Sequence, residues 1–279
     1  MRFTKMQGLG NDYIYIDASK ETVQNPAALA KAVSDVRFGA GSDGLVLILP
    51  DPEADFRMRM FNADGSEAEM CGNAARCIGK YVFERGLTDK TEIRLMTGSG
   101  IRHLQLQVKG KKVLSVRVDM GMPAFRPEEI PVNLPGNIIT NHPVQIEDKS
   151  FEITCVSMGN PHAVIFVEDA DSFDVSYYGP LLENHPLFPK KANIEFVTVR
   201  DENHLRMRVW ERGSGETWAC GTGACASLVA GVSTGRCDRS AVLTLNGGDL
   251  LVEWDEKTGH VFQQGPAEFV YDGEWLAGN

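Results

Sequence analysis

The chain has 279 residues, of which 43% are hydrophobic and 24% are charged, and its formal net charge at pH 7 is −10. This length allows two domains with a core each, and the composition is that of a soluble globular protein. The acidic balance argues against a surface that binds nucleic acid or anionic membranes. Because the sequence has neither an apolar run of membrane-spanning length nor an apolar signal region at its start, we expect a cytoplasmic protein with no nucleic-acid or membrane partner.

The cysteines bear on metal binding and redox chemistry. The chain contains six of them, Cys71, Cys77, Cys155, Cys220, Cys225 and Cys237. In a cytosolic protein of this size free thiols are favoured over disulfides. No Cys-x-x-Cys pair with matching His spacing supports a zinc site, so we expect no metal.

The first half of the chain predicts a β-rich unit with two helices. A Gly-rich turn at Gly8–Asp12 separates two strands, and a helix begins near Pro26 and ends before Gly39. Further strands are expected at Leu45–Leu49, Phe56–Met60, Glu92–Met96, Ile101–Val108 and Val113–Met120. The segment Gly121–Pro135 has the composition of a linker.

Cys71 lies at the start of the second predicted helix. A turn rich in Asn, Asp, Gly and Ser ends the strand Phe56–Met60, and a helical pattern starts directly after Cys71 and continues to about Gly86. The free N–H groups and the dipole of a helix N-terminus can lower a cysteine pKa from ~8.5 into the range ~3.5–7.5. The same N–H groups can bind a carboxylate. A lone cysteine is, however, more often a small buried hydrophobe.

The second half of the chain repeats the first at an offset of 149 residues. Cys220 stands at this distance from Cys71, and several other residues recur in the same ungapped register. They are Gly10-Asn11 with Gly159-Asn160, Arg57-Met58-Arg59 with Arg206-Met207-Arg208, Glu67 with Glu216, Gly72 with Gly221, and Ala75 with Ala224. Such a series indicates an internal duplication.

The duplication predicts an α+β fold of two pseudo-symmetric domains. In each domain a curved, mostly antiparallel sheet would wrap around one central helix. We assign residues 1–120, with about 264–279, to the first domain and residues 121–263 to the second.

Two equivalent thiols point to a two-base racemase or epimerase. One thiolate would remove a proton from a carbon while one thiol donates a proton to the opposite face. An amino-acid α-carbon is a weak acid, so the site needs preorganised donors near the developing charge. The N-terminal residues of the two helices would supply them, namely Gly72, Asn73, Gly221 and Thr222.

Several motifs resemble those of the diaminopimelate epimerase family. The match to the family signature is Asn62-x-Asp64-Gly65-Ser66-x-x-x-x-Cys71-Gly72-Asn73-Ala74-x-Arg76. Further matches are Gly8-x-Gly10-Asn11-Asp12, Met158-Gly159-Asn160-Pro161-His162, Glu211-Arg212-Gly213 and Cys220-Gly221-Thr222-Gly223. The resemblance covers essentially the whole chain.

This resemblance implies interconversion of LL- and meso-2,6-diaminopimelate without pyridoxal phosphate or another cofactor, in lysine and bacterial cell-wall synthesis. It also implies a homodimer. Cys71 and Cys220 would be the catalytic bases. The residues that it assigns to substrate binding are Asn11, Asn62, Asn160, Asn193, Glu211 and Arg212, and it places His162 near the site in a supporting role.

The two halves of the chain differ at positions that would contact the two ends of the substrate, of which only one reacts. Asn62 is matched by Glu211, and Ala63 by Arg212, so the second half can read an ammonium and a carboxylate. One position departs from the family pattern: some members carry a substrate-side Gln where this chain has Gly44. We therefore assign Gly44 no side-chain role.

Other interpretations of these residues remain open at this point. A related two-thiol racemase would act on proline or hydroxyproline, and a thiol-redox protein would cycle a disulfide between its cysteines. Asn11 and Asn160 could be turn formers, and His162 could be a packed strand residue. Glu67 and Glu216 are kept outside the site. A solvated strand face is expected for four arginines, Arg57, Arg59, Arg206 and Arg208.

Overall fold

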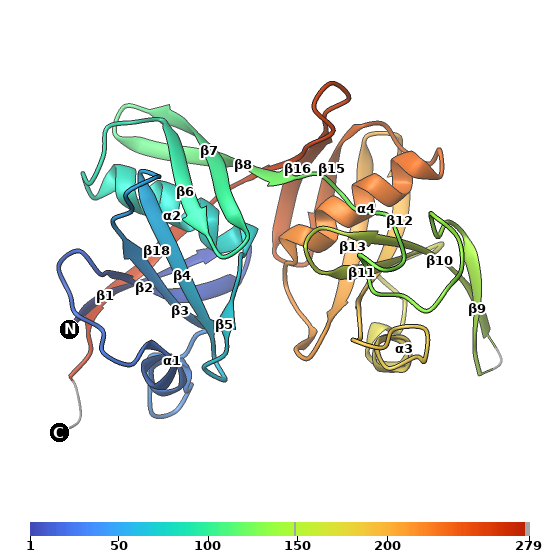
Figure 1. Ribbon diagram of the computed structural model, residues 1–279, viewed down its shortest axis with the longest axis horizontal. Helices are drawn as coiled ribbons and strands as arrows, with labels where there is room; N and C mark the ends of the chain where they lie inside the picture. The colour runs from blue at the N-terminus through green and yellow to red at the C-terminus, as the bar shows by residue number, and fades with distance from the viewer. Residues whose placement is uncertain (148, 277–279) are drawn as a thin grey trace. The chain divides into compact units, whose positions relative to one another are not determined.

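The computed structural model describes residues 1–147 and 149–276. The chain forms two compact units, of which the first combines Met1–Asp119 with the segment from Gln264 onward, and the second is Met120–Gln263 (Figure 1). The domains expected from the sequence also include residues 148 and 277–279, which lie outside the described residues. Each unit is described by itself below.

The first unit contains one mixed sheet and two helices. Its elements are β1 (Arg2–Gly8), β2 (Asn11–Asp17), α1 (Pro26–Ser34), β3 (Gly44–Leu49), β4 (Phe56–Asn62), β5 (Glu67–Ala68), α2 (Gly72–Glu84), β6 (Glu92–Thr97), β7 (Gly100–Lys109), β8 (Lys112–Gly121) and β18 (Glu268–Glu274). The strands pair in the order β18-β1-β2-β3-β4-β6-β7-β8. In this order β2 with β3 and β4 with β6 run parallel, and the remaining neighbours are antiparallel.

The helix α2 is enclosed by its unit. Every residue from Gly72 to Lys80 is buried, including the charged Arg76, because β1, β2 and β7 pack against the helix. Arg76 donates from Nε to the Pro266 carbonyl at 3.0 Å, which fastens the returning C-terminal segment to α2. A helix buried around its whole circumference forms the centre of a core.

The second unit repeats this order of elements. It contains β9 (His142–Ile146), β10 (Lys149–Ser157), β11 (Pro161–Phe166), α3 (Val175–Glu183), β12 (Asn193–Asp201), β13 (His204–Glu211), β14 (Gly215–Glu216), α4 (Gly221–Ser233), β15 (Ser240–Leu245), β16 (Gly248–Trp254) and β17 (Val261–Gly265). As in the first unit, two pairs are parallel, β11 with β12 and β13 with β15. The antiparallel pairs are β9 with β10, β10 with β11, β12 with β13, and β15 with β16. The α+β fold predicted from the sequence is thereby confirmed.

One local expectation was confirmed and one was wrong. The first helix ends at Ser34, before Gly39, because Asp35 leaves the helical conformation and its carboxylate accepts from the N–H groups of Arg37 and Phe38. The segment Gly121–Pro135 is not a free linker, since Ile130 and Val132 are buried in the core of the second unit. Composition alone could not show that these apolar residues are buried in a hydrophobic core.

Within the described residues, no helix combines the length and apolar character needed to span a membrane.

Candidate functional site

Cys71 is the N-cap residue of α2, in an extended conformation (φ −141°, ψ 123°). Its thiol is half-buried, and Sγ lies 3.5 Å from Oδ1 of Asn11. Asn73, in the first turn of α2, donates from Nδ2 to the same oxygen at 3.2 Å. The loop between β1 and β2 therefore brings Asn11 to the N-terminus of the helix that Cys71 begins.

Asp43 holds the other end of the Asn11 side chain. Its Oδ2 accepts from Asn11 Nδ2 at 2.7 Å and from the backbone N–H of Asp12 at 3.0 Å. Burial raises the pKa of the Asp43 carboxyl, and the Asp12 N–H opposes this effect. This contact arises because β2 and β3 run side by side in parallel, so the residues that precede them meet.

Asn62 lies at the end of β4 and organises the turn that leads to Cys71. Its backbone N–H donates to the Ser66 carbonyl at 2.8 Å, and its Nδ2 donates to Ser66 Oγ at 3.0 Å. Asn62 pairs with Gly44 of β3. A Cβ atom at Gly44 would lie 2.1 Å from the Phe61 carbonyl oxygen, so this close pairing of β3 with β4 requires glycine.

Cys220 occupies the equivalent position in the second unit. It is the N-cap of α4 (φ −115°, ψ 107°), and its Sγ accepts from the Gly223 N–H at 3.3 Å and lies 3.5 Å from Thr222 Oγ1. Asn160 donates from Nδ2 to Thr222 Oγ1 at 3.2 Å. This contact is the counterpart of the one between Asn73 and Asn11, at the same offset of 149 residues.

A buried carboxylate and imidazole support Asn160. His162 Nδ1 lies 2.7 Å from Oε1 of Glu195, and its Nε2 lies 2.9 Å from Oδ1 of Asn160. The side chains of His162 and Glu195 are both 0% exposed. Parallel pairing of β11 with β12 sets His162 opposite Asn193 and brings Glu195 beneath the imidazole.

The turn after β13 presents Glu211 and Arg212. Burial raises the pKa of the Glu211 carboxyl, which accepts a hydrogen bond from the Thr217 hydroxyl. The Arg212 side chain is exposed, and its backbone N–H donates to Asn193 Oδ1 at 2.9 Å. Asn193 is buried and donates from Nδ2 to the Pro161 carbonyl at 3.0 Å, so it acts as a support for the turn.

The environment of Cys220 opposes the effect of the helix N-terminus on its thiol. Burial raises its pKa well above the ordinary value, and the carboxylates of Glu211 and Glu195 raise it further. The Thr222 hydroxyl and the Gly223 N–H lower it by less. The helix N-terminus is thus outweighed by desolvation and nearby negative charge.

A correction concerns the arginines of β13, which do not form a solvated face, whereas the side chains of Arg57 and Arg59 on β4 are 43% and 41% exposed. Arg59 binds Glu67 through two hydrogen bonds of 2.7 and 3.0 Å, and Arg208 binds Glu216 with the same two lengths. Arg206 is buried and binds Asp171 at 2.7 Å. The paired arginines fasten the short strands β5 and β14 that precede each cysteine.

The predicted site residues therefore form two groups, one in each unit. The first contains Cys71, Asn11, Asn62, Gly72 and Asn73, and the second contains Cys220, Asn160, His162, Asn193, Glu211, Arg212, Gly221 and Thr222.

Sequence reasoning missed three residues that hold these groups, Asp43, Glu195 and Glu183. Glu195 had a usable signal, because it is a lone charge within the apolar strand Ile194–Val197. Asp43 and Glu183 had no such signal, because the role of each depends on contacts with residues distant in the sequence.

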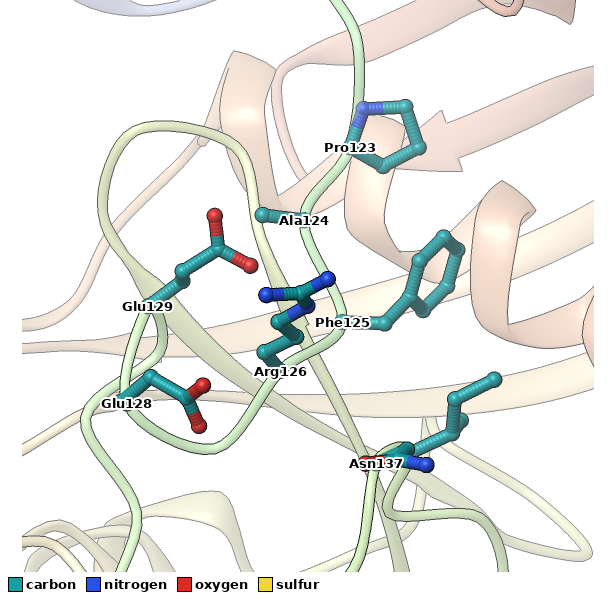
Figure 2. A pocket seen from close by; sticks show the side chains of 8 residues that line it. Pro123, Ala124, Phe125, Arg126, Glu128, Glu129 and Asn137 are labelled. Carbon is teal, nitrogen blue, oxygen red and sulfur yellow. The ribbon is translucent and has the colours of Figure 1, made fainter.

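No set of three His, Cys, Asp or Glu side chains in the described part of the chain is placed to hold a metal ion. A hollow of about 650 Å³ opens in the second unit beside the loop Pro123–Glu129 (Figure 2). Its charged lining side chains are Arg126, Glu128 and Glu129. None of the predicted site residues lines it, so it is separate from the groups described above.

Solved structures define the class to which this fold belongs. A hydroxyproline epimerase from Agrobacterium vitis aligns with a TM-score of 0.73 at 16% identity, over 98% of this chain and 91% of that chain. A phenazine biosynthesis protein from Bacillus anthracis aligns with a TM-score of 0.70 at 19% identity, over 99% of each chain. The fold is therefore one that an amino-acid epimerase also adopts.

Sequence comparison is more specific. The family model described as diaminopimelate epimerase matches residues 3–126 and 154–270. Diaminopimelate epimerase of Acetivibrio thermocellus is 60% identical over 274 residues, which cover 98% of each chain. The enzyme of that name from Methanococcus maripaludis is 53% identical over 98% of this chain and 99% of its own. The chain belongs to the diaminopimelate epimerase family, which confirms the resemblance found in its motifs.

Proposed function

We propose that this protein interconverts LL- and meso-2,6-diaminopimelate, without a cofactor, in the synthesis of lysine and cell-wall precursors. The observation that carries the proposal is the repeated cysteine. In a chain of this family, Cys71 and Cys220 each stand at the N-cap of a helix of 13 residues, at equivalent positions of the repeat. Such a pair supplies a base and an acid of the same chemical type.

In the proposed reaction one cysteine thiolate removes the α-hydrogen as a proton, and the electron pair stays on the substrate. The thiol of the other cysteine then donates its proton to the opposite face, so that a new C–H bond forms with inverted configuration. The N–H groups at the start of α2 and α4 would stabilise the charge that develops on the adjacent carboxylate. After each turnover the two sulfur atoms have exchanged their protonation states.

The surroundings of Cys220 suit the role of proton donor. Burial and the carboxylates of Glu211 and Glu195 keep its thiol protonated, because they raise its pKa. In the direction in which Cys220 donates, the base is Cys71. In the opposite direction, contact with the ammonium of a bound substrate would offset the negative charge of Glu211 and ease ionisation of Cys220.

The distal end of the substrate would be read by the turn that follows β13. The exposed guanidinium of Arg212 suits a carboxylate, and the carboxylate of Glu211 suits an ammonium. Asn62 stands at the equivalent position in the first unit and offers a neutral side chain instead. One end of a diaminopimelate molecule would thus be anchored while the other reacts.

An assay in deuterated water tests this proposal and both of its rivals. LL- and meso-diaminopimelate, L-proline and trans-4-hydroxy-L-proline would each be incubated with the purified protein. We expect inversion of diaminopimelate with deuterium incorporated at the inverted carbon, and no change in the two cyclic amino acids. Inversion of proline or hydroxyproline alone would overturn the proposal. Disulfide reduction without deuterium incorporation into any substrate would favour a thiol-redox protein.

We also propose a homodimer in the cytoplasm. The strand β18 pairs with β1 and leaves Val270 and Tyr271 exposed at 51% and 42%, which is apolar area that a second copy could cover. Light scattering should give twice the chain mass of 30.7 kDa, and replacing Val270 and Tyr271 with Asp should give one chain mass. Cell fractionation checks the location.

A further inference from the structure

Asn11 and Asn160 occupy equivalent positions in the two units but turn opposite ends of the carboxamide toward their helix. The carbonyl of Asn11 faces Asn73 and Cys71 at the start of α2, at 3.2 and 3.5 Å. The amino group of Asn160 faces Thr222 at the start of α4, at 3.2 Å. The duplicated scaffold therefore carries two half-sites of opposite polarity.

In the first unit, Asp43 determines the orientation of Asn11. Oδ2 of Asp43 already accepts from the backbone N–H of Asp12, so it is an acceptor toward its neighbours. Only the NH2 end of Asn11 can donate to that oxygen, at 2.7 Å. The carbonyl end must then point to the helix.

In the second unit, His162 and Glu195 determine the orientation of Asn160. The carboxylate of Glu195 accepts from His162 Nδ1–H at 2.7 Å. His162 Nε2 faces Oδ1 of Asn160 at 2.9 Å, a contact that is a hydrogen bond only if Nε2 also carries a hydrogen. Both ring nitrogens then donate, so the imidazole is cationic and the NH2 end of Asn160 points to the helix.

The charge balance around Glu195 supports a cationic His162. Glu195 is 0% exposed, and its Oε2 has no hydrogen-bond partner among the described residues. The titratable groups that face it from the neighbouring elements are Glu211 on β13, Cys220 on α4 and Cys155 on β10. All three are acids, so His162 is left to balance the buried carboxylate.

We propose that Asp43 and Glu195, the latter through His162, are positioning residues that hold Asn11 and Asn160 in opposite orientations. The first helix then presents a carbonyl acceptor to a substrate ammonium, and the second presents an NH2 donor to a substrate carboxylate. The orientation itself follows from the contacts above, whereas its use in substrate binding rests on the proposed function.

Nitrogen-15 NMR of the full chain without substrate tests the orientation in the second unit. The signals of His162 are assigned by their loss in a His162→Gln variant. We expect hydrogens on both ring nitrogens in the wild type, and loss of one of them in Glu195→Gln, which removes the negative charge. A neutral His162 in the wild type, or the same form in both proteins, would overturn the inference. Because this measurement needs no catalysis, it stays decisive even if diaminopimelate is not the substrate.

Steady-state kinetics test the consequence for binding. Asp43→Asn and Glu195→Gln should each raise KM for diaminopimelate about tenfold, with a smaller change in kcat, because each frees a carboxamide to turn. Asp171→Asn and Glu152→Gln make the same chemical change outside the site and should leave both constants unaltered. A fall in kcat at unchanged KM in both variants would contradict a positioning role. If the wild type does not invert diaminopimelate at all, the proposed function fails instead.

Glu195→Gln places an amide where a buried carboxylate stood, so its folding is checked by circular dichroism. Asp43→Asn provides an independent test, since Asp43 belongs to the other unit and lies nearer the surface. An Asn at position 43 can turn its own NH2 group toward Asn11. We therefore expect Asp43→Glu, which keeps the acceptor, to restore part of the lost affinity.

Discussion

At Cys220 two physical effects act in opposite directions on one thiol. The N-terminus of α4 offers the Gly223 N–H, which favours the thiolate. Burial and two carboxylates favour the thiol and prevail. This arrangement favours the protonated form of Cys220, as the proposed role of proton donor requires.

The proposed mechanism predicts that replacing Cys71 or Cys220 removes nearly all epimerisation. We expect Cys71→Ala and Cys220→Ala to be inactive, and the Ser variants to lose about 10²- to 10⁴-fold in kcat, because an alcohol is a far poorer base than a thiolate at neutral pH. Stereochemical assay of diaminopimelate measures the effect. Cys237→Ser, which changes a partly buried cysteine outside the site, should retain wild-type activity. Full activity in Cys220→Ala would refute the two-base mechanism.

At the scale of the elements, a repeated ion pair holds the turn in front of each cysteine. Arg59 with Glu67 and Arg208 with Glu216 have the same bidentate geometry but differ in exposure, since Glu67 is 47% exposed and Glu216 is 25% exposed. Arg208 also donates to the carbonyls of the segment before α3. The second pair is therefore the more constrained of the two.

Breaking the second pair should cost more stability than breaking the first. We expect Glu67→Ala to lower the free energy of unfolding by about 0.2–1 kcal/mol, as for exposed pairs, and Glu216→Ala to lower it by more, since Arg208 is less exposed to water. Urea denaturation measures both values. Equal losses would show that the difference in exposure has no energetic effect.

Through Glu183, the helix α3 supports the turn that carries Glu211 and Arg212. This buried carboxylate accepts from Trp210 Nε1 at 2.8 Å, from the Gly213 N–H at 3.0 Å and from Lys191 Nζ at 3.3 Å. Glu183→Gln can keep only some of these three hydrogen bonds, so Glu211 and Arg212 would lose their fixed positions. We expect KM for diaminopimelate to rise roughly tenfold.

Glu147, which contacts the same helix, provides a matched control for that experiment. Glu147 accepts from the hydroxyl of Tyr177 on α3 at 2.6 Å but is exposed. Glu147→Gln should therefore leave KM unchanged. If both variants shifted KM equally, the effect would belong to α3 in general and not to the turn.

At the scale of the whole molecule, buried thiols make stability depend on pH in the alkaline range. Burial raises the pKa of Cys77 and of Cys155 to about 12, against ~8.5 in an unfolded chain. Since the folded pKa is the higher one, the stabilising contribution is complete below pH ~8.5 and is lost as the pH rises toward 12. One such thiol would account for roughly 2 kcal/mol by pH 10.

We therefore expect the free energy of unfolding to fall between pH 8.5 and pH 10, and to fall less steeply in Cys155→Ala. Urea denaturation at several pH values under reducing conditions gives the slope. Val156→Ala removes a buried apolar side chain from the same strand without removing a titratable group, so it should lower stability but keep the wild-type slope. An unchanged slope in Cys155→Ala would contradict the argument.

The sequence by itself determined the internal repeat and the family, and it singled out Cys71 and Cys220 among the six cysteines. These depend on local patterns: a Gly-, Asn- and Ser-rich turn before Cys71, a helical pattern after it, and the same signals again around Cys220. It also contains the difference between Asn62 in the first half and Glu211 in the second. Such features can be read from neighbours along the chain because turn chemistry and helix starts are local properties.

Only the tertiary structure decided the electrostatics of the site. Asp43 reaches Asn11 across 32 residues, and Glu195 reaches His162 across 33, in both cases because two strands run parallel. Strand register sets these contacts, and through Glu195 it contributes to the raised pKa of Cys220. Burial and distant charge outweigh a local helix terminus at Cys220, and no pattern of adjacent residues encodes either of them.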